Sequence, residues 1–157
     1  MIKTQSDFRS FMDIALAEAR AAAVRGEVPV GAVVVGPGGV VVTQAGNRTR
    51  ELCDPTAHAE VLALRAACAL AGSERLPGHD LYVTLEPCPM CAAAISAARV
   101  ARLYYGAADV KSGGVAVGAR VFSHAQCHHA PEVYDGIAAT ESEALLRDFF
   151  AGKRKPG

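Results

Sequence analysis

The sequence contains no tryptophan, carries no net charge and has no long uninterrupted apolar segment. Sixteen lysine and arginine residues balance sixteen aspartate and glutamate residues, so any nucleic-acid partner has to be bound by a local basic patch. The longest apolar run, residues 28–42, is interrupted by proline and glycine and is typical of β strands. A membrane-spanning helix needs about 18 or more apolar residues in succession. We therefore expect no contact with the membrane interior.

The cysteines do not follow the pattern of a disulfide scaffold. They number five, which is odd, and two of them, Cys88 and Cys91, form a C-x-x-C motif. That pattern suits a reducing compartment and a metal or redox role. The charged N-terminal residues 1–13 lack the apolar core of a secretory signal peptide. We therefore expect a cytoplasmic protein.

Turn residues and the spacing of apolar residues predict a mixed α/β chain. Helical periodicity followed by glycine indicates helices, and short β-branched runs between turn residues indicate strands. The expected order is helix, β hairpin, helix, strand, helix, strand, loop and helix, over residues 6–26, 30–45, 56–71, 80–85, 87–98, 102–106, 111–118 and 139–154. We expect one mixed sheet with helices on both faces, in a single domain of residues 1–157 with a basic tail at about 152–157.

Helix ends are predicted from side chains that pair with free backbone groups. Ser6 or Asp7 is expected to cap the first helix, and Thr56 the second. Thr140 and Glu143 fit a capping box at the start of the last helix. The apolar stripe of that helix is predicted to consist of Leu146, Phe149 and Phe150.

Two motifs in different parts of the chain carry metal-ligand chemistry. Cys88 and Cys91 flank Pro89 at a predicted helix start, where the helix dipole and free amide groups stabilise thiolates. His58 stands at another predicted helix start, and the intervening strand 80–85 places the two helices side by side. Both helix N-termini can then face one point. An imidazole and two thiolates form a ligand set that suits zinc.

Glu60 adds a general acid/base to this set. It follows His58 by two positions, which in an ideal helix separates the two side chains by about 200°. If His58 lies at the helix edge, that rotation does not apply, and both side chains can reach the same ion. Glu60 would then face the coordination position that catalytic zinc leaves to water, where it would take a proton and return it to a leaving group.

Other interpretations stay open from these residues alone. His58 could be a buried structural histidine, and the C-x-x-C motif could be a redox pair. A closed structural zinc site without chemistry needs a fourth protein ligand, for which Cys53 or His128 is available. His128 and His129 could instead bind a phosphate group.

The motifs, taken in order, resemble those of a known family. The segments EVPVGAVVV, GNR, DPTAHAE, LYVTLEPCPMC, YYGAADVKSGG and LLRDFF follow one another within residues 8–155. HAE followed by PCxxC is the pattern of the zinc-dependent cytidine and adenosine deaminases, whose general mechanism is established. The whole set is similar to the bacterial tRNA-specific adenosine deaminases.

The resemblance implies a cytidine deaminase-like α/β/α fold and conversion of adenosine to inosine at the wobble position of a tRNA anticodon, with release of ammonia. His58, Cys88 and Cys91 would bind one Zn²⁺ per subunit, and Glu60 would be the catalytic proton carrier. The partner would be the anticodon arm, whose splayed bases suit recognition in a loop, and the enzyme would be a homodimer. The expected substrate-binding residues are Asn47, Asp109, Phe149, Lys153 and Arg154.

Two features leave the substrate open. Residues 130–136, APEVYDG, depart from the usual continuation after the histidine pair His128–His129. Pro89 in the C-P-M-C motif also occurs in bacterial guanine deaminases. The alternative is therefore a deaminase of a free base or nucleoside, such as guanine or cytosine, with the same chemistry in a pocket closed over a small molecule.

Overall fold

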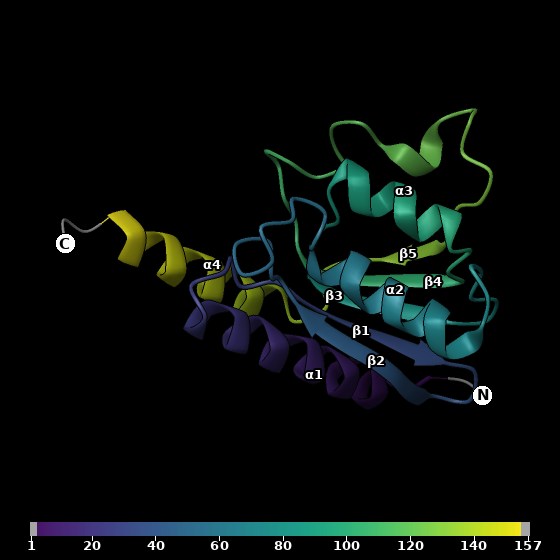
Figure 1. The fold of residues 1–157 in the computed structure, drawn as a ribbon, viewed down its shortest axis with the longest axis horizontal. Helices are drawn as coiled ribbons and strands as arrows, with labels where there is room; N and C mark the ends of the chain where they lie inside the picture. The colour runs from purple at the N-terminus through teal and green to yellow at the C-terminus, as the bar shows by residue number, and fades with distance from the viewer. Residues whose placement is uncertain (1–2, 155–157) are drawn as a thin grey trace.

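A five-stranded mixed sheet forms the centre of the computed structural model, which describes residues 3–154 (Figure 1). The strands are β1 (Gly31–Gly36), β2 (Val40–Gly46), β3 (Asp80–Leu85), β4 (Arg102–Ala107) and β5 (Glu132–Tyr134). They lie side by side in the order β2-β1-β3-β4-β5. β1 is antiparallel to both β2 and β3, whereas β3, β4 and β5 are parallel. The parallel strands all point their carboxyl ends to the same edge of the sheet.

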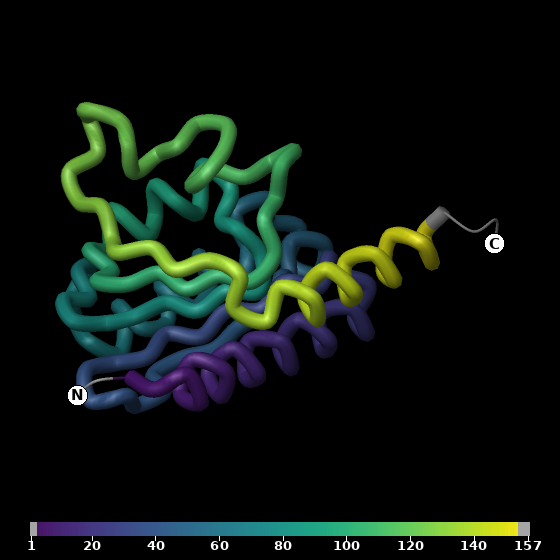
Figure 2. The backbone as a smooth tube through the Cα atoms, turned by 180° about the vertical axis from the view of Figure 1, so that it is seen from behind, coloured from purple at the N-terminus to yellow at the C-terminus, as the bar shows by residue number. Residues whose placement is uncertain are grey.

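Helices cover both faces of this sheet (Figures 1 and 2). α2 (Ala59–Ala71) and α3 (Pro89–Ala97) lie on one face. α1 (Gln5–Val24) and α4 (Ala139–Arg154) lie on the other, and the short 3-10 helix η1 (Val121–Ser123) packs near α3. The three layers confirm the predicted α/β class with helices on both faces.

Alternation along β1 explains why every residue of that strand is buried. Ala32 and Val34 pack into the apolar core beneath α2 and α3, whereas Val33 and Val35 pack into the core beneath α1. A strand between two helix layers needs apolar side chains on both faces, because neither face meets water. The valine run of this segment therefore encodes its place between the two layers.

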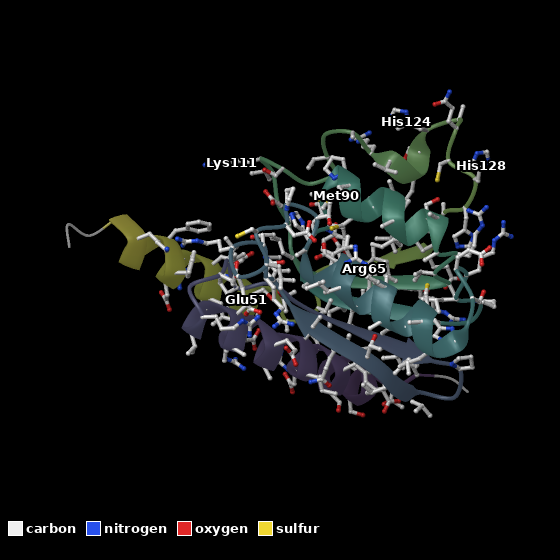
Figure 3. The ribbon with its side chains drawn as sticks, in the orientation of Figure 1. Glu51, Arg65, Met90, Lys111, His124 and His128 are labelled. Carbon is white, nitrogen blue, oxygen red and sulfur yellow. The ribbon has the colours of Figure 1, made fainter. Side chains whose placement is uncertain are left out.

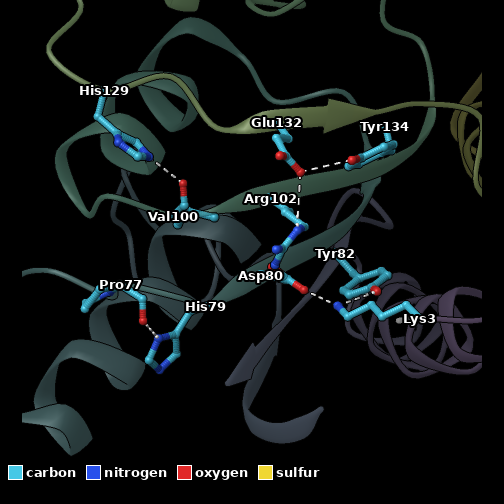
Figure 4. A network of polar contacts seen from close by, with 10 residues as sticks. All are labelled: Lys3, Pro77, His79, Asp80, Tyr82, Val100, Arg102, His129, Glu132 and Tyr134. Carbon is cyan, nitrogen blue, oxygen red and sulfur yellow. Dashed lines mark hydrogen bonds and ion pairs between the residues drawn. The ribbon is translucent and has the colours of Figure 1, made fainter. Parts of the chain in front are cut away.

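Three stacked tyrosines, one from each parallel strand, tie β3, β4 and β5 together, and Figure 4 shows two of them, Tyr82 and Tyr134. Tyr82 and Tyr104 stack with their ring centroids 4.4 Å apart, and Tyr104 and Tyr134 stack at 4.9 Å. Beside them, the buried carboxylate of Asp80 forms ion pairs with Lys3 and with Arg102. The stacked rings and the ion pairs of Asp80 stabilise the parallel part of the sheet.

The predicted strands and helices are all present; β3 and α4 have the predicted bounds, whereas the ends of the other elements differ by a few residues. Thr4, not Ser6 or Asp7, is the N-cap of α1, and its capping box uses Asp7 as the returning partner. Thr56 does not cap α2, because the helix begins at Ala59 and His58 is the N-cap. Thr56 instead donates its hydroxyl proton to Asp54, which holds it in the preceding turn.

The last helix has the predicted bounds, residues 139–154, but differs from its prediction in two other ways. Thr140 is its second residue, so it lies inside the first turn rather than at the cap. Its contact with the core uses Leu145, whereas Phe150 is 43% exposed. The predicted stripe is therefore displaced around the helix. β5 and η1 were not predicted, since each has only three residues and none of the six is buried.

Among the described residues, no helix has both the length and the apolar character that crossing a bilayer requires. Lys155 of the basic tail lies outside the residues that the structure describes.

Candidate active site

Two helix N-termini meet at the edge of the sheet where β3 ends. His58 is the N-cap of α2, and Cys88 is the N-cap of α3, with Cys91 in the first turn of that helix. Both cap residues have extended backbone dihedral angles, φ −72° and ψ 151° for His58 and φ −70° and ψ 170° for Cys88. Neither side chain caps its own helix by a hydrogen bond, so both are free to turn toward the space between the helices.

The three side chains converge on one point. The Nδ1 atom of His58 lies 3.4 Å from the Sγ of Cys91 and 3.7 Å from the Sγ of Cys88. All three ligand atoms lie within 4.8 Å of one another. Tetrahedral zinc with bonds of about 2.3 Å to sulfur and about 2.05 Å to nitrogen separates such atoms by about 3.6 Å. The spacing therefore fits a zinc ion bound by His58, Cys88 and Cys91.

The cluster has three members. Within residues 3–154 no fourth histidine, cysteine or carboxylate joins it. Cys53, one candidate for a fourth ligand, is exposed and directs its thiol to the carbonyl of Arg50 at 3.8 Å. His128, the other candidate, lies on a loop beyond the C-terminal end of α3, whereas Met90 marks the first turn of that helix (Figure 3). The closed structural site considered from the sequence therefore lacks its fourth ligand.

Protons are unevenly distributed in the cluster. The hydrogen bond from Cys91, followed by that from His58, lowers the pKa of Cys88 to about 4 against the effect of burial. The same contact with Cys88 raises the pKa of Cys91 and, through its hydrogen bond, that of His58. Cys88 is therefore the intrinsic thiolate. A divalent cation favours deprotonated thiolates, so its binding releases the proton of Cys91.

Glu60 is a buried carboxyl group next to this cluster. It is the second residue of α2 and is only 4% exposed. Burial raises the pKa of Glu60, with the charge of His58 acting in the opposite direction. Because His58 precedes the helix, the two side chains do not diverge as they would within one, and both line the same pocket. A carboxyl group with a raised pKa is suited to accept and release a proton near neutral pH.

The pocket that contains His58 and Glu60 has a volume of about 220 Å³. Asn47 and Thr49 line it on one side, in the loop that leads from β2 to α2. On the other side, its lining includes Asp109 and Ser112 from the loop that follows β4. A larger cavity of about 490 Å³ lies between α3 and residues 121–128, away from the metal cluster.

Asn47 joins two parts of the pocket wall. Its Oδ1 atom accepts a hydrogen bond of 2.8 Å from the backbone N–H of Ala59, the first residue of α2. Its Nδ2 atom donates a hydrogen bond of 3.2 Å to the carbonyl of Val28. Asn47 therefore satisfies a free amide at the start of α2, between His58 and Glu60. Its second Nδ2 hydrogen remains available in the pocket.

Two buried glutamates that the sequence interpretation missed support the two loops. Glu27, 1% exposed, accepts hydrogen bonds from the backbone N–H groups of Arg50 and Glu51 at 3.1 and 2.9 Å. Glu86, 2% exposed, accepts three backbone hydrogen bonds from the loop after β4. The sequence feature that could have indicated them is a single acidic residue beside an apolar strand: Glu27 in GEVPV and Glu86 in TLEPC.

Two further predicted RNA contacts, Phe149 and Lys153, do not line the pocket. Phe149 and Lys153 lie on α4, with the Lys153 Nζ atom 5.3 Å from the centroid of the Phe149 ring. Arg154 ends α4, the part of the helix that projects away from the sheet in Figures 1 and 2. The Nε2 atom of His129 donates a hydrogen bond of 2.6 Å to the carbonyl of Val100, which anchors its loop. These positions can meet only a ligand larger than the pocket.

The family model for the cytidine and deoxycytidylate deaminase zinc-binding region matches residues 5–107, more than half of the chain. The chain belongs to this deaminase family. The match includes His58, Glu60, Cys88 and Cys91. The zinc expected from the sequence is thus supported twice, by the family and by the three converging ligands.

Individual relatives of the deaminase separate the substrate classes. It is 62% identical over 144 residues to the tRNA-specific adenosine deaminase of Agrobacterium fabrum. The matched residues cover 92% of this chain and 94% of that protein. A structure solved in studies of A-to-I editing by tRNA:A34 deaminases is 61% identical, with a TM-score of 0.85 over 87% of this chain and 99% of that chain. The guanine deaminase of Bacillus subtilis is 39% identical, with a TM-score of 0.61 over 63% of each chain. The sequence identity to the tRNA deaminases is therefore higher than that to this guanine deaminase.

Proposed function

We propose that this deaminase converts adenosine to inosine at the wobble position of a tRNA anticodon and releases ammonia. The cluster of His58, Cys88 and Cys91, with Glu60 lining the same pocket as His58 and Cys88, supports the hydrolytic deamination. The similarity to tRNA-specific adenosine deaminases over nearly the whole chain supports the substrate. The alternative of a structural zinc module has less support, because the cluster lacks a fourth protein ligand among the described residues.

The metal ligands and Glu60 would have separate roles in the reaction. Zinc held by His58, Cys88 and Cys91 would supply a Lewis acid that makes water more acidic. Glu60 would accept the proton of the water whose oxygen adds to C6 of adenine, and would deliver a proton to the amino group that leaves as ammonia. The raised pKa of Glu60 suits both transfers. Water is consumed and no redox partner is needed.

Substrate contacts are assigned to the pocket walls and to α4. Asn47 and Asp109 would meet the flipped-out nucleoside, and their presence in the pocket lining supports this assignment. Phe149, Lys153 and Arg154 would meet the anticodon arm outside the pocket, where an aromatic ring and positive charges suit a stacked base and phosphates.

The five free cysteines agree with a reducing cytoplasm. A homodimer is part of the proposal, and its test is the molecular mass in solution.

The test is incubation of the zinc-loaded protein with an anticodon stem-loop that carries adenosine at the wobble position. Inosine should form, and kcat/KM should fall steeply with added salt because phosphate contacts release counterions. Guanine is the competing substrate. Salt-independent turnover of guanine, without inosine formation in the stem-loop, would establish the free-base deaminase instead.

A further inference from the structure

We propose that Glu86 is a positioning residue, which holds the loop of residues 109–118 in the shape that forms one wall of the substrate pocket. The proposal rests on the proposed function, since the wall carries Asp109 and Ser112 toward the bound nucleoside. Glu86 also borders the pocket, but it is 2% exposed and both of its carboxylate oxygens accept hydrogen bonds from backbone N–H groups of the loop. It therefore acts through the loop rather than on the substrate.

The contacts of Glu86 reach both ends of the loop. Its Oε1 atom accepts a hydrogen bond of 3.1 Å from the N–H of Asp109. Its Oε2 atom accepts bonds of 3.2 Å from Val115 and 2.9 Å from Ala116. The side chain is 2% exposed and has no ion-pair partner among residues 3–154. Burying a carboxylate without hydrogen bonds destabilises the folded state, and the three backbone N–H groups offset this loss of hydration.

Two glycines allow the loop to approach this carboxylate. A Cβ atom on Gly113 would lie 2.5 Å from Oε2 of Glu86 and 2.5 Å from the carbonyl oxygen of Asp109. A Cβ atom on Gly114 would lie 2.6 Å from the nitrogen of Pro89, at the start of α3. Only glycine fits at such distances. The loop is therefore built to wrap around Glu86 and to rest on the metal-binding turn.

The same segment connects the pocket wall with the metal ligands. Glu86 and Pro87 directly precede Cys88, and the N–H of Gly114 donates to the carbonyl of Pro87 at 2.8 Å. Asp109 in turn uses its Oδ1 atom to accept the N–H groups of Lys111 and Ser112 at 3.2 and 3.0 Å. Its Oδ2 atom has no hydrogen-bond partner among the described residues, which leaves it for a ligand in the pocket. Glu86 thus fixes the position of Asp109 relative to the metal.

The isosteric substitution Glu86→Gln separates this role from simple packing. The amide oxygen of glutamine can accept the two bonds from Val115 and Ala116, but its NH₂ group then faces the N–H of Asp109. Because two donors repel each other, the substitution removes the hydrogen bond to Asp109 at one end of the loop. The volume of the side chain stays the same. Zinc content should stay at one per chain.

Kinetics and hydrogen exchange together test the proposal. With the anticodon stem-loop as substrate, Glu86→Gln should lower kcat/KM by about 10- to 100-fold, the range for loss of a hydrogen bond to a charged group. Amide exchange should accelerate within residues 109–118 and not in α2. In a double-mutant cycle with Asp109→Ala, the two losses should not add, because both act through the same wall. Glu74→Gln, an exposed glutamate remote from the pocket, is the control and should leave all values unchanged.

Additive losses, or wild-type exchange and kinetics in Glu86→Gln, overturn the proposal. If Glu86→Gln fails to fold or loses zinc, Gly113→Ala decides, since its methyl group pushes the loop from Oε2 without altering the carboxylate. A selective loss of kcat/KM in that variant supports the role, and wild-type kinetics rejects it. Absence of inosine with the wild-type protein would reject the proposed function alone, because the exchange experiment needs no substrate.

Discussion

At the scale of single residues, Glu60 has surroundings that suit a proton carrier. It is buried beside three metal ligands, and burial raises the pKa of its carboxyl group. Its neighbours in the chain, Ala59 and Val61, offer no titratable group that could replace it. We therefore propose Glu60 as the proton carrier of the pocket.

The substitution Glu60→Gln should remove turnover and spare metal binding. A glutamine cannot carry the proton, so kcat should fall by at least about 100-fold. Zinc content, measured by atomic emission on the purified variant, should remain one per chain, because Glu60 is not a member of the ligand cluster. Wild-type turnover in this variant would remove Glu60 from the chemistry.

Glu27 is a second residue whose charge has a structural consequence. Burial favours its neutral form, but the backbone N–H groups of Glu51 and Arg50, with the Thr49 hydroxyl, prevail and lower the pKa of Glu27. A carboxylate with a lowered folded pKa stabilises the protein above its unfolded pKa of about 4.3, and the stabilisation is lost as pH falls through the folded value.

Glu27→Gln should therefore destabilise the protein in a pH-dependent way. Near neutral pH we expect the free energy of unfolding to fall by about 1–3 kcal/mol, from the loss of hydrogen bonds to a charged acceptor. Urea titrations from about pH 6 down to about pH 3 should show the difference between wild type and variant shrinking. A difference that is constant over this range would contradict the role of the charge.

At the scale of elements, the start of α2 decides the geometry of the site. The helix begins at Ala59, so His58 precedes it and Glu60 lies within it. Asn47, from the end of the β2 segment, fixes that start by accepting the N–H of Ala59. Thr56, which local sequence favours as the cap, pairs with Asp54 instead. A tertiary contact thus sets the helix boundary.

Asn47→Ala and Thr56→Ala should differ in their cost. Removing Asn47 leaves a buried N–H group without its partner, and we expect a loss of about 1–3 kcal/mol in the free energy of unfolding. Thr56 makes only an exposed contact and should cost less than about 0.5 kcal/mol. Thermal and urea unfolding of the two variants provide the comparison, and equal losses would refute the capping role of Asn47.

These elements also show which features a sequence can predict. Valine runs, glycine stops and the Pro89 helix start depend on neighbouring residues, so the strands and helices and the three metal ligands were predictable. The bonds from Asn47 to Ala59 and from Glu86 to Asp109 join residues far apart in the chain, so no local pattern reports them. β5 was missed because its three residues are exposed and pair only with β4.

At the scale of the whole molecule, two apolar cores flank the sheet and need no metal to form. One core lies beneath α2 and α3, and the other lies beneath α1 and α4. An ion pair of 2.6 Å between Arg9 and Glu141 links α1 to α4. A chain of this length buries roughly 68–70% of the surface that it exposes when unfolded. The fold therefore positions the metal ligands before the ion arrives.

Removal of zinc should abolish activity without unfolding the protein. After treatment with a chelator, the far-ultraviolet circular dichroism should keep the helix and strand signal, and thermal unfolding should stay cooperative at a lower Tm, since the bound metal stabilises only the folded state. Restored zinc should restore turnover. A chelated protein that is unfolded, as small zinc-dependent domains are, would contradict this independence.

The most direct test of the metal centre is a crystal structure of the zinc-loaded protein, with anomalous differences measured at the zinc edge. We predict one peak at about 2.3 Å from the Sγ atoms of Cys88 and Cys91 and about 2.05 Å from Nδ1 of His58, with no fourth protein ligand and with Glu60 facing the open side. A peak elsewhere, or a fourth side chain such as Cys53 or His128 on the ion, would contradict it.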